Sequence, residues 1–204
     1  DSRGLSLFKT ESMLIVILLV IVSSQVVSTI VSLNYETALL EAFPGAELKD
    51  AQTKYSADTY MWSTGCSLLL QLLIVPLVLI AIPLQYVHFF IPLLNFGTLL
   101  YVAYNPSLQS STMAFMVFKA FDYSLFRAAK EILYIPLSFE AKFRAKELID
   151  VLGYRTSKGV TAIAITGAKL LGCVISTGVF GTIGAVASLS WFFFVIPVTK
   201  RKKI

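Results

Sequence analysis

The sequence predicts an all-α integral membrane protein that crosses the bilayer with six transmembrane helices. Hydrophobic residues make up 56% of its 204 residues and charged residues only 14%, a balance far from that of a soluble domain. Apolar residues gather in six stretches, close to the roughly 20 residues that a helix needs to cross a bilayer. Lys and Arg residues gather in alternate connections between these stretches, as they do in proteins that cross a membrane repeatedly.

The six expected spans form a single membrane domain that covers residues 1–204. In chain order they are 12–33, 59–82, 89–104, 112–136, 160–179 and 182–198. The first, second, third and sixth contain no charged residue, so their burial in hydrocarbon is favourable. Pro76 lies in the second span, Pro92 in the third and Pro83 between them; inside a span, neighbouring helices can satisfy the backbone groups that a proline frees.

The distribution of charge places both chain ends on the inner side of the membrane. The connection 34–58 carries five acidic residues and two lysines, so we expect it outside. Basic residues instead precede the first span, follow the fourth span and end the chain: Arg3, Lys9, Lys142, Arg144, Lys146, Arg155, Lys158 and residues 200–203. Six crossings bring these three groups to one side, which satisfies the positive-inside rule. Because the chain begins with Asp1 rather than Met, we also expect an upstream portion.

Residues 139–152, between the fourth and fifth spans, have an amphipathic pattern. Apolar residues such as Phe143 and Ile149 alternate there with Lys142, Lys146 and other charged residues. The pattern predicts an amphipathic helix that lies along the inner membrane surface. Its basic residues are expected to hold anionic lipid headgroups or to steer an anionic solute.

The fifth and sixth spans carry small residues one helical turn apart, Ala168 with Gly172 and Gly181 with Ala185. Such pairs let membrane helices approach each other closely. Lys169 is the exception, because it is a cation inside the fifth span. We expect it to point toward the charged face of the fourth span and to share a polar pocket with it.

The fourth span is distinguished by five charged residues near its middle: Lys119, Asp122, Arg127, Lys130 and Glu131. Each charge at a helix centre costs about 2.5–3.5 kcal/mol if it faces lipid, so these side chains must face other helices or water. At about 100° per residue they fit on half of the helix, around a stripe that includes Tyr123, Phe126 and Tyr134.

Two interpretations of this charged face are open. Lys119 with Asp122, and Arg127 with Glu131, have the spacing of ion pairs on a helix, so the face could be a structural network that holds the bundle together. Alternatively, its excess of positive charge could form a binding site for an anionic substrate at the membrane midplane.

Other classes of function have little support in the sequence. No cluster of Cys, His and carboxylates has metal-ligand spacing, and the stretch 167–169 lacks the earlier glycine of a phosphate-binding loop. Cys66 and Cys173 lie in apolar segments, where they are expected to be packing residues. The basic excess is confined to loops and a tail, unlike a nucleic-acid-binding surface. We therefore expect no enzymatic activity, no cofactor or metal, and no nucleic-acid partner.

Three gapped motifs mark the stretch 119–159. They are K-x-x-x-Y-S-L-F-x-x-x-K-E-x-x-Y-I-P-L from Lys119, K-x-x-x-K-x-x-I-D-V from Lys142, and S-K-G at 157–159. This stretch resembles the nucleotide transporter family of ATP/ADP translocases, found in plastids and obligate intracellular bacteria. The resemblance implies one half of a twelve-span, major-facilitator-like carrier that exchanges ATP for ADP or imports nucleotides. By position, the chain resembles the C-terminal half.

The resemblance makes Lys119, Lys130, Glu131 and Lys158 the leading candidates for nucleotide contact or coupling. Together with their neighbours, the candidate substrate-binding residues are Lys119, Asp122, Tyr123, Arg127, Lys130, Glu131, Lys158 and Lys169. The implied location is a bacterial inner membrane or the inner envelope of a plastid or similar organelle. The implied partners are the lipid bilayer, a nucleotide, and a missing N-terminal half, a second copy or other membrane subunits.

Some features depart from the family pattern. Asp122 stands where the family often has a cation, and the end of the first span, residues 31–36, lacks the usual Trp-Lys pair. Six spans alone also lack the second half of an alternating-access pair. These departures permit an alternative, in which a carrier-derived subunit no longer transports and instead packs helices in a larger membrane complex.

Overall fold

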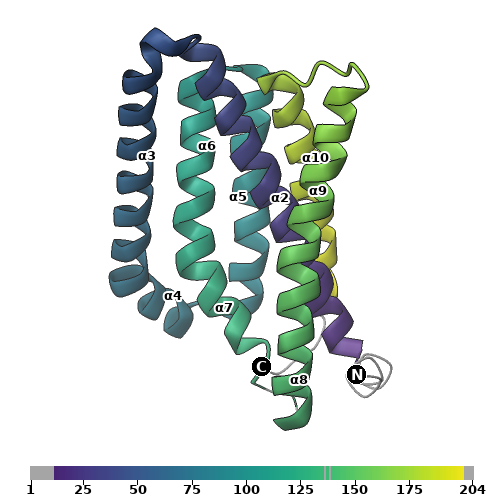
Figure 1. The fold of residues 1–204 in the computed structure, drawn as a ribbon. Helices are drawn as coiled ribbons and strands as arrows, with labels where there is room; N and C mark the ends of the chain where they lie inside the picture. The colour runs from purple at the N-terminus through teal and green to yellow at the C-terminus, as the bar shows by residue number, and fades with distance from the viewer. Residues whose placement is uncertain (1–11, 136, 138, 200–204) are drawn as a thin grey trace.

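The computed structural model describes residues 12–135, 137 and 139–199, and in this part of the chain every regular element is a helix (Figure 1). Three helical rods are single helices: α2 (Ser12–Ala42), α5 (Leu84–Tyr104) and α10 (Thr177–Thr199). The other rods are successions of segments: η1 (Ala46–Leu48), α3 (Lys49–Leu69), η2 (Leu70–Ile74) and α4 (Val75–Ala81); α6 (Leu108–Phe121), η3 (Asp122–Phe126) and α7 (Arg127–Ile132); α8 (Phe139–Ile149), η4 (Asp150–Thr156) and α9 (Ser157–Leu170). The predicted all-α class is therefore confirmed for these residues.

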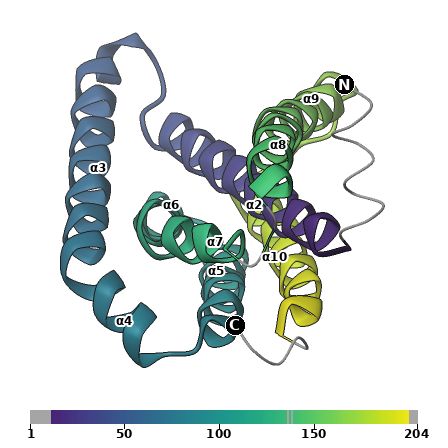
Figure 2. The same ribbon diagram turned by 90° about the horizontal axis from the view of Figure 1, so that it is seen from below.

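Helix α2 lies at the centre of the bundle and packs against α10, α6, α9 and η4. Helix α5 packs against α10 and α6 on the far side. Helix α3 packs mainly against α6 and lies with α4 at the edge of the bundle (Figure 2). The most apolar part of the α3–α4 rod is only 11% buried, so in a bilayer its surface is offered to lipid.

Aromatic contacts tie the core together around α2. The rings of Tyr35 in α2 and Phe115 in α6 stack with their centroids 4.6 Å apart. Phe126 lies edge-on to His88 of α5 at 6.2 Å and to Trp191 of α10 at 5.2 Å. All five side chains are almost fully buried, so these rings join four rods into one core.

The segments η2, η3 and η4 are π-helical. A π turn closes its hydrogen bond at i+5 rather than i+4 and therefore contains more residues than an α turn. Side chains that follow a π segment are rotated relative to their positions in a regular α-helix. Because η3 and η4 interrupt the two rods that carry most candidate residues, they alter which of those residues share a face.

Within the described residues, the helices long and apolar enough to cross a membrane are Met13–Ala42, Ala46–Ala81, Leu84–Tyr104 and Thr177–Pro197. They correspond to the first, second, third and sixth predicted spans and confirm an integral membrane protein. The first two are longer than predicted, because residues 34–42 continue α2 and residues 46–58 belong to the same rod as the second span. The fourth predicted span is too charged to qualify by composition and stays a prediction; its end, Pro136, lies outside the described residues.

The region 139–179 differs from its prediction in two ways. Helix α9 ends at Leu170, and residues 171–176 form a connection instead of the end of a fifth span. Gly172 in this connection has a φ of 87°, a left-handed conformation that favours glycine and ends the helix. In addition, residues 139–152 do not form a separate surface helix, because α8 passes through η4 into α9 as one rod (Figure 1).

One of the two expected small-residue contacts is formed. A Cβ atom at Gly181 would lie 2.6 Å from the Ala103 backbone nitrogen and 2.9 Å from the Leu99 carbonyl oxygen, so α10 and α5 touch through their backbones. A Cβ atom added at Gly172 would instead meet nothing within 4 Å, and this residue lies beyond the end of α9. Its pairing with Ala168 is therefore not a helix contact.

The bundle places α8 at the same end as the start of α2 and the end of α10 (Figure 1). The predicted topology requires this arrangement, because it assigns both termini and the basic connection to the inner side. The side of the membrane on which this end lies stays a prediction.

Candidate functional site

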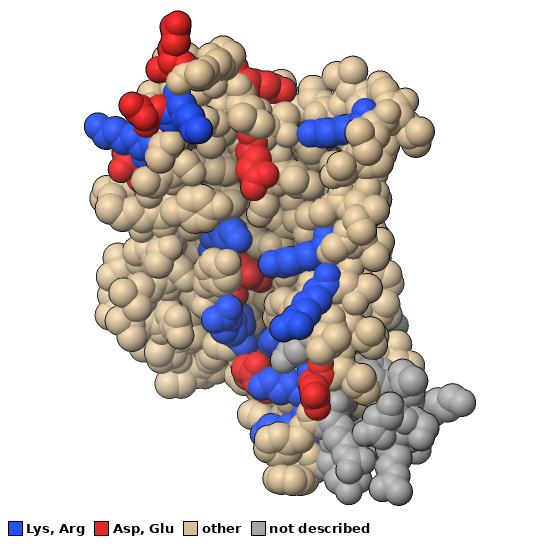
Figure 3. Space-filling view, viewed as in Figure 1, with Lys and Arg blue, Asp and Glu red and all other residues tan. Residues whose placement is uncertain are grey.

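Charged residues gather on one face of the bundle, between the α6–η3–α7 rod and the α8–η4–α9 rod. Helix α2 packs against α6, α9 and η4 and therefore lies between the two rods at the base of this face. Figure 3 shows blue Lys and Arg side chains along this face, with red carboxylates among them. We call this face, with its two rods and α2, the charged groove.

The α6–η3–α7 rod contributes cations that surround one exposed aromatic ring. The Lys119 Nζ atom donates a hydrogen bond to the Tyr123 hydroxyl at 3.2 Å and lies 5.1 Å from the centre of that ring. The Arg127 guanidinium lies 5.4 Å from the same ring centre. Cations at these distances are attracted by the ring quadrupole, so Tyr123 holds Lys119 and Arg127 on one side of the groove.

Asp122 lies at the start of η3 among cations from both rods. Its carboxylate interacts electrostatically with Lys119, Lys158, Arg127 and Lys130. Lys158 comes from the first turn of α9 and is exposed, so it belongs to the opposite wall. The groove therefore brings Lys119, Arg127 and Lys158 together around a single carboxylate.

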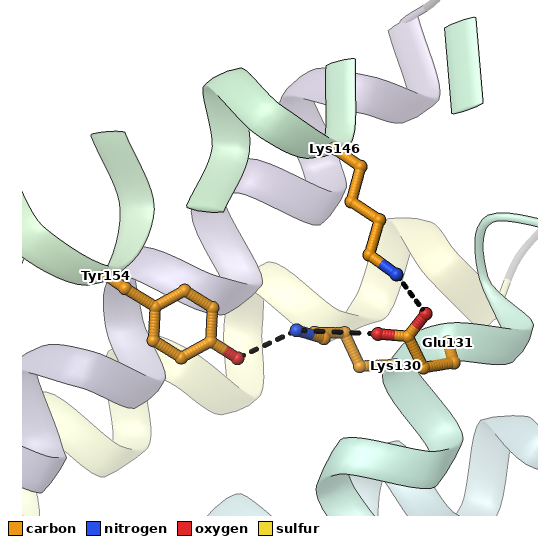
Figure 4. Close-up of polar contacts among 4 residues, drawn as sticks. All are labelled: Lys130, Glu131, Lys146 and Tyr154. Carbon is orange, nitrogen blue, oxygen red and sulfur yellow. Dashed lines mark hydrogen bonds and ion pairs between the residues drawn. The ribbon is translucent and has the colours of Figure 1, made fainter. Parts of the chain in front are cut away.

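Two polar contacts join the rods at the end of the groove near α8 (Figure 4). The Lys130 Nζ atom donates a hydrogen bond to the Tyr154 hydroxyl at 2.8 Å and lies 4.7 Å from the centre of its ring. The Lys146 Nζ atom lies 2.6 Å from Glu131 Oε2, and Lys130 lies 3.8 Å from Glu131 Oε1. Lys130 and Glu131, which are consecutive residues of α7, thus contact η4 and α8, respectively.

The π segment η4 explains why residues so far apart on one rod reach the same groove. In a regular α-helix, Lys146 and Lys158 would point about 120° apart around the axis. The smaller rotation per residue of a π-helix brings them closer to one side. Gly153 in η4 allows this segment to approach α2, because a Cβ atom there would lie 2.8 Å from the Ile21 side chain.

The structure brings most of the predicted site residues into the groove but leaves Lys169 outside. Asp122, Tyr123, Arg127, Lys130, Glu131, Lys119 and Lys158 all lie along its two walls. Lys169 lies in the last turn of α9, eleven residues and about 16 Å beyond Lys158. Its Nζ atom lies 5.3 Å from the ring centre of Phe180 in α10. The expected pocket shared with the fourth span is therefore not formed.

The expected stripe of the fourth span is also divided. Tyr123 is 38% exposed, whereas Phe126, Lys130 and Tyr134 are at most 5% exposed. The π segment η3 lies within this stripe, so residues on its two sides no longer share one face of the rod. Glu131 pairs with Lys146 instead of Arg127, so the expected pair on α7 is not formed.

Sequence reasoning missed the roles of Lys146 and Tyr154. Lys146 was assigned to a surface helix, and Tyr154 was not among the candidate residues. Their approach to α7 depends on the continuous α8–η4–α9 rod and its π segment, which leave no pattern in the hydropathy. The packing of Gly153 against Ile21 is likewise visible only in three dimensions.

The groove has the chemistry of an anion-binding site. Among the side chains that the structure describes, five cations and two carboxylates contribute to it, and Tyr123 adds an exposed aromatic face. In the described part of the chain, no three His, Cys, Asp or Glu side chains are grouped so that they could hold a metal ion. The charge alone therefore favours a ligand that is itself negative.

Comparison with known proteins relates this groove to a family of carriers. None of the solved structures matches the chain. The family model described as TLC ATP/ADP transporter matches residues 72–201, which include both rods of the charged groove and more than half of the chain. The chain therefore belongs to the TLC ATP/ADP transporter family.

Proposed function

We propose that the chain is the C-terminal half of a carrier that exchanges or imports adenine nucleotides, with the charged groove as its phosphate-binding surface. The observation that carries this proposal is that Lys119 and Arg127 lie against one exposed aromatic ring, next to a carboxylate that also interacts with Lys158 of the other rod. A structural ion-pair network needs no such surplus of accessible positive charge.

Each of these three cations has a direct role in the proposal. At an effective dielectric constant of about 20, a cation about 4 Å from a phosphate charge gains about 4 kcal/mol before desolvation is subtracted. Tyr123 offers the exposed ring on which a base can stack. Lys130 and Glu131 serve differently, because their contacts with Tyr154 and Lys146 hold the two walls together.

The proposal also accounts for charges inside the fourth and fifth predicted spans. In a six-span topology, the α6–η3–α7 and α8–η4–α9 rods cross the membrane with their charged faces turned toward each other and away from lipid. The open side of the groove is then covered by a second half, as in major-facilitator-like carriers. That half is an N-terminal portion, a second copy or another membrane subunit, in a bacterial inner membrane or an organelle inner envelope.

Uptake of labelled ATP and ADP into proteoliposomes tests the proposal. The protein is reconstituted with any partner that co-purifies, and wild type is compared with Lys158→Met and with the matched control Lys169→Met. We expect Lys158→Met to reduce uptake at least several-fold and Lys169→Met to leave it unchanged, because only Lys158 lies in the groove. Wild-type uptake at the level of empty vesicles would refute the carrier and favour the structural subunit.

A further inference from the structure

Four buried polar atoms in α5 and α10 have no hydrogen-bond partner among the described residues. They are His88 Nε2 and Asn95 Oδ1 in α5, and Ser188 Oγ and Trp191 Nε1 in α10. Each of these side chains is at most 1% exposed, so neither lipid nor a partner protein reaches it. A buried polar group without a hydrogen bond is costly, above all inside a membrane, so these four atoms need a partner of another kind.

Asn95 and Ser188 lie at the same level of the interface between the two helices. The helices are antiparallel, because later residues of α10 contact earlier residues of α5. A Cβ atom at Gly184 would lie 2.9 Å from the Leu99 side chain. Ser188 follows Gly184 by one helical turn and Asn95 precedes Leu99 by one turn, so both belong to the contacting faces. Their side chains therefore face each other across the interface.

Neither of these two side chains satisfies its oxygen atom within its own helix. The Asn95 Nδ2 atom donates a hydrogen bond to the Ile91 carbonyl oxygen at 2.8 Å, which leaves Oδ1 at the other end of the amide. Ser190 in α10 donates to the Val186 carbonyl oxygen four residues earlier, whereas Ser188 makes no such bond. Both oxygen atoms therefore require a partner inside the interface.

The interface widens toward Asn95 and Ser188. A Cβ atom at Gly181 would meet backbone atoms of α5 at 2.6–2.9 Å, whereas one at Gly184 would first meet the side chain of Leu99. The helices thus touch through their backbones at one turn and through a side chain at the next. One turn further on, Asn95 and Ser188 form no direct hydrogen bond with each other. Polar groups that face each other at more than hydrogen-bond distance are commonly bridged by water.

The mixture of donors and acceptors indicates the same ligand. Asn95 Oδ1 can only accept a hydrogen bond, Trp191 Nε1 can only donate one, and the Ser188 hydroxyl can do both. A metal cation would need acceptors alone, whereas a water molecule donates and accepts, and buried waters typically bond to about three otherwise unsatisfied polar groups. We infer that water molecules are bound between α5 and α10, where one bridges Asn95 to Ser188 and others bond to Trp191 and His88. This inference is independent of the proposed function, because none of the four residues belongs to the charged groove.

A double-mutant cycle tests the bridge between Asn95 and Ser188. Ser188→Ala, Asn95→Leu and the double variant are prepared with any partner that co-purifies, and their equilibrium unfolding in detergent is measured. Asn95→Ala closes the cycle if Asn95→Leu fails to fold. Ser190→Ala is the matched control, because it removes a hydroxyl from an exposed position of the same helix.

If water bridges the two oxygen atoms, Ser188→Ala leaves both the water and Asn95 without a partner. We expect this variant to raise the equilibrium constant of unfolding about fivefold or more. The double variant should be affected much less than the two single changes combined, and Ser190→Ala should stay within about twofold of wild type. In a dry interface Ser188→Ala would stabilise the protein and the two changes would add, which would overturn the inference.

Nuclear magnetic resonance at the Trp191 indole distinguishes water from a direct hydrogen bond between Asn95 and Ser188. The chain has two tryptophans, so in ¹⁵N-tryptophan-labelled Trp62→Phe the remaining indole N–H signal belongs to Trp191. We expect a nuclear Overhauser effect between this proton and water, although the side chain is buried. Coupling in the cycle without this effect would mean a direct contact in a dry interface. The inference requires both results, and the failure of either overturns it.

Discussion

Replacing Gly181 with alanine tests the close contact between α10 and α5. The added Cβ atom would lie 2.6 Å from the Ala103 nitrogen, 2.9 Å from the Ala103 Cα and 2.9 Å from the Leu99 carbonyl oxygen. All three are backbone atoms, so no side chain can rotate away. Since ordinary contacts begin at 3.4 Å, the helices would have to separate by about 0.8 Å, the kind of backbone shift that overpacking imposes.

The size of the effect follows from two opposing terms. Overpacking of this kind destabilises a protein by about 1–3 kcal/mol, whereas replacing glycine with alanine inside a helix favours the helix by up to about 1 kcal/mol. Gly65 in α3 and Gly97 in α5 have open space for a Cβ atom within 4 Å, so their replacement by alanine yields only the second term. The difference between Gly181→Ala and either control therefore isolates the packing term.

Equilibrium unfolding in detergent, followed by far-UV circular dichroism, measures this difference. We expect Gly181→Ala to be about 1–3 kcal/mol less stable than Gly97→Ala or Gly65→Ala. Equal stability of Gly181→Ala and the two controls would refute the backbone contact between α5 and α10.

Three further predictions concern the charged groove and its support. Tyr154→Phe removes the hydroxyl that accepts a hydrogen bond from Lys130 but keeps the ring, so it should lower the free energy of unfolding by about 1.5–3 kcal/mol. Tyr154→Leu also removes the ring and should lower it further. Identical unfolding of Tyr154→Phe and wild type would argue against this hydrogen bond. The Lys146–Glu131 pair is half-exposed, so a double-mutant cycle with Lys146→Met and Glu131→Gln should give a coupling energy of about 0.2–1 kcal/mol that decreases with added salt. A larger coupling energy that does not change with salt would contradict the exposure of this pair. Phe126→Ala should destabilise the protein by about 3–5 kcal/mol, because Phe126 is buried between His88 and Trp191. Tyr123→Ala should leave stability nearly unchanged and should weaken nucleotide binding. Unfolding and ligand titration measure the two effects, and the reverse pattern would contradict the assignment of Phe126 to the core and Tyr123 to the groove.

Hydropathy was sufficient to predict the class of this protein and four of its membrane helices. Long apolar runs such as 12–33 identify spans, because a helix in lipid has no alternative to satisfying its own backbone. Hydropathy did not predict the continuation of α2 to Ala42 or the start of the second rod at Ala46, since both extensions carry acidic residues among their apolar ones. Tyr35 and Leu39 of the first extension are buried in the core, so packing within the bundle supports it.

The charged face was predicted from residue types, but its division into groove and core was not. A constant rotation of about 100° per residue places Lys119 and Lys130 on one stripe, and that rotation is not maintained through η3. The contact between Tyr154 and Lys130 was likewise not predicted, because Tyr154 lies within the π segment η4, where the rotation per residue also differs from 100°. The error over Lys169 has a different origin, because the break at Gly172 places this residue at a helix end.

The lengths of the rods determine how far the protein extends beyond the lipid. The rod from Ala46 to Ala81 contains 36 residues and is about 54 Å long, compared with about 30 Å for the hydrocarbon layer. Its polar beginning, with the exposed residues Asp50 and Lys54, therefore stands clear of the acyl chains, while α8 overhangs the opposite end of the bundle (Figure 1). A protease or an antibody that approaches from the side of Asp50 would therefore contact the polar start of this rod before it contacts the lipid surface.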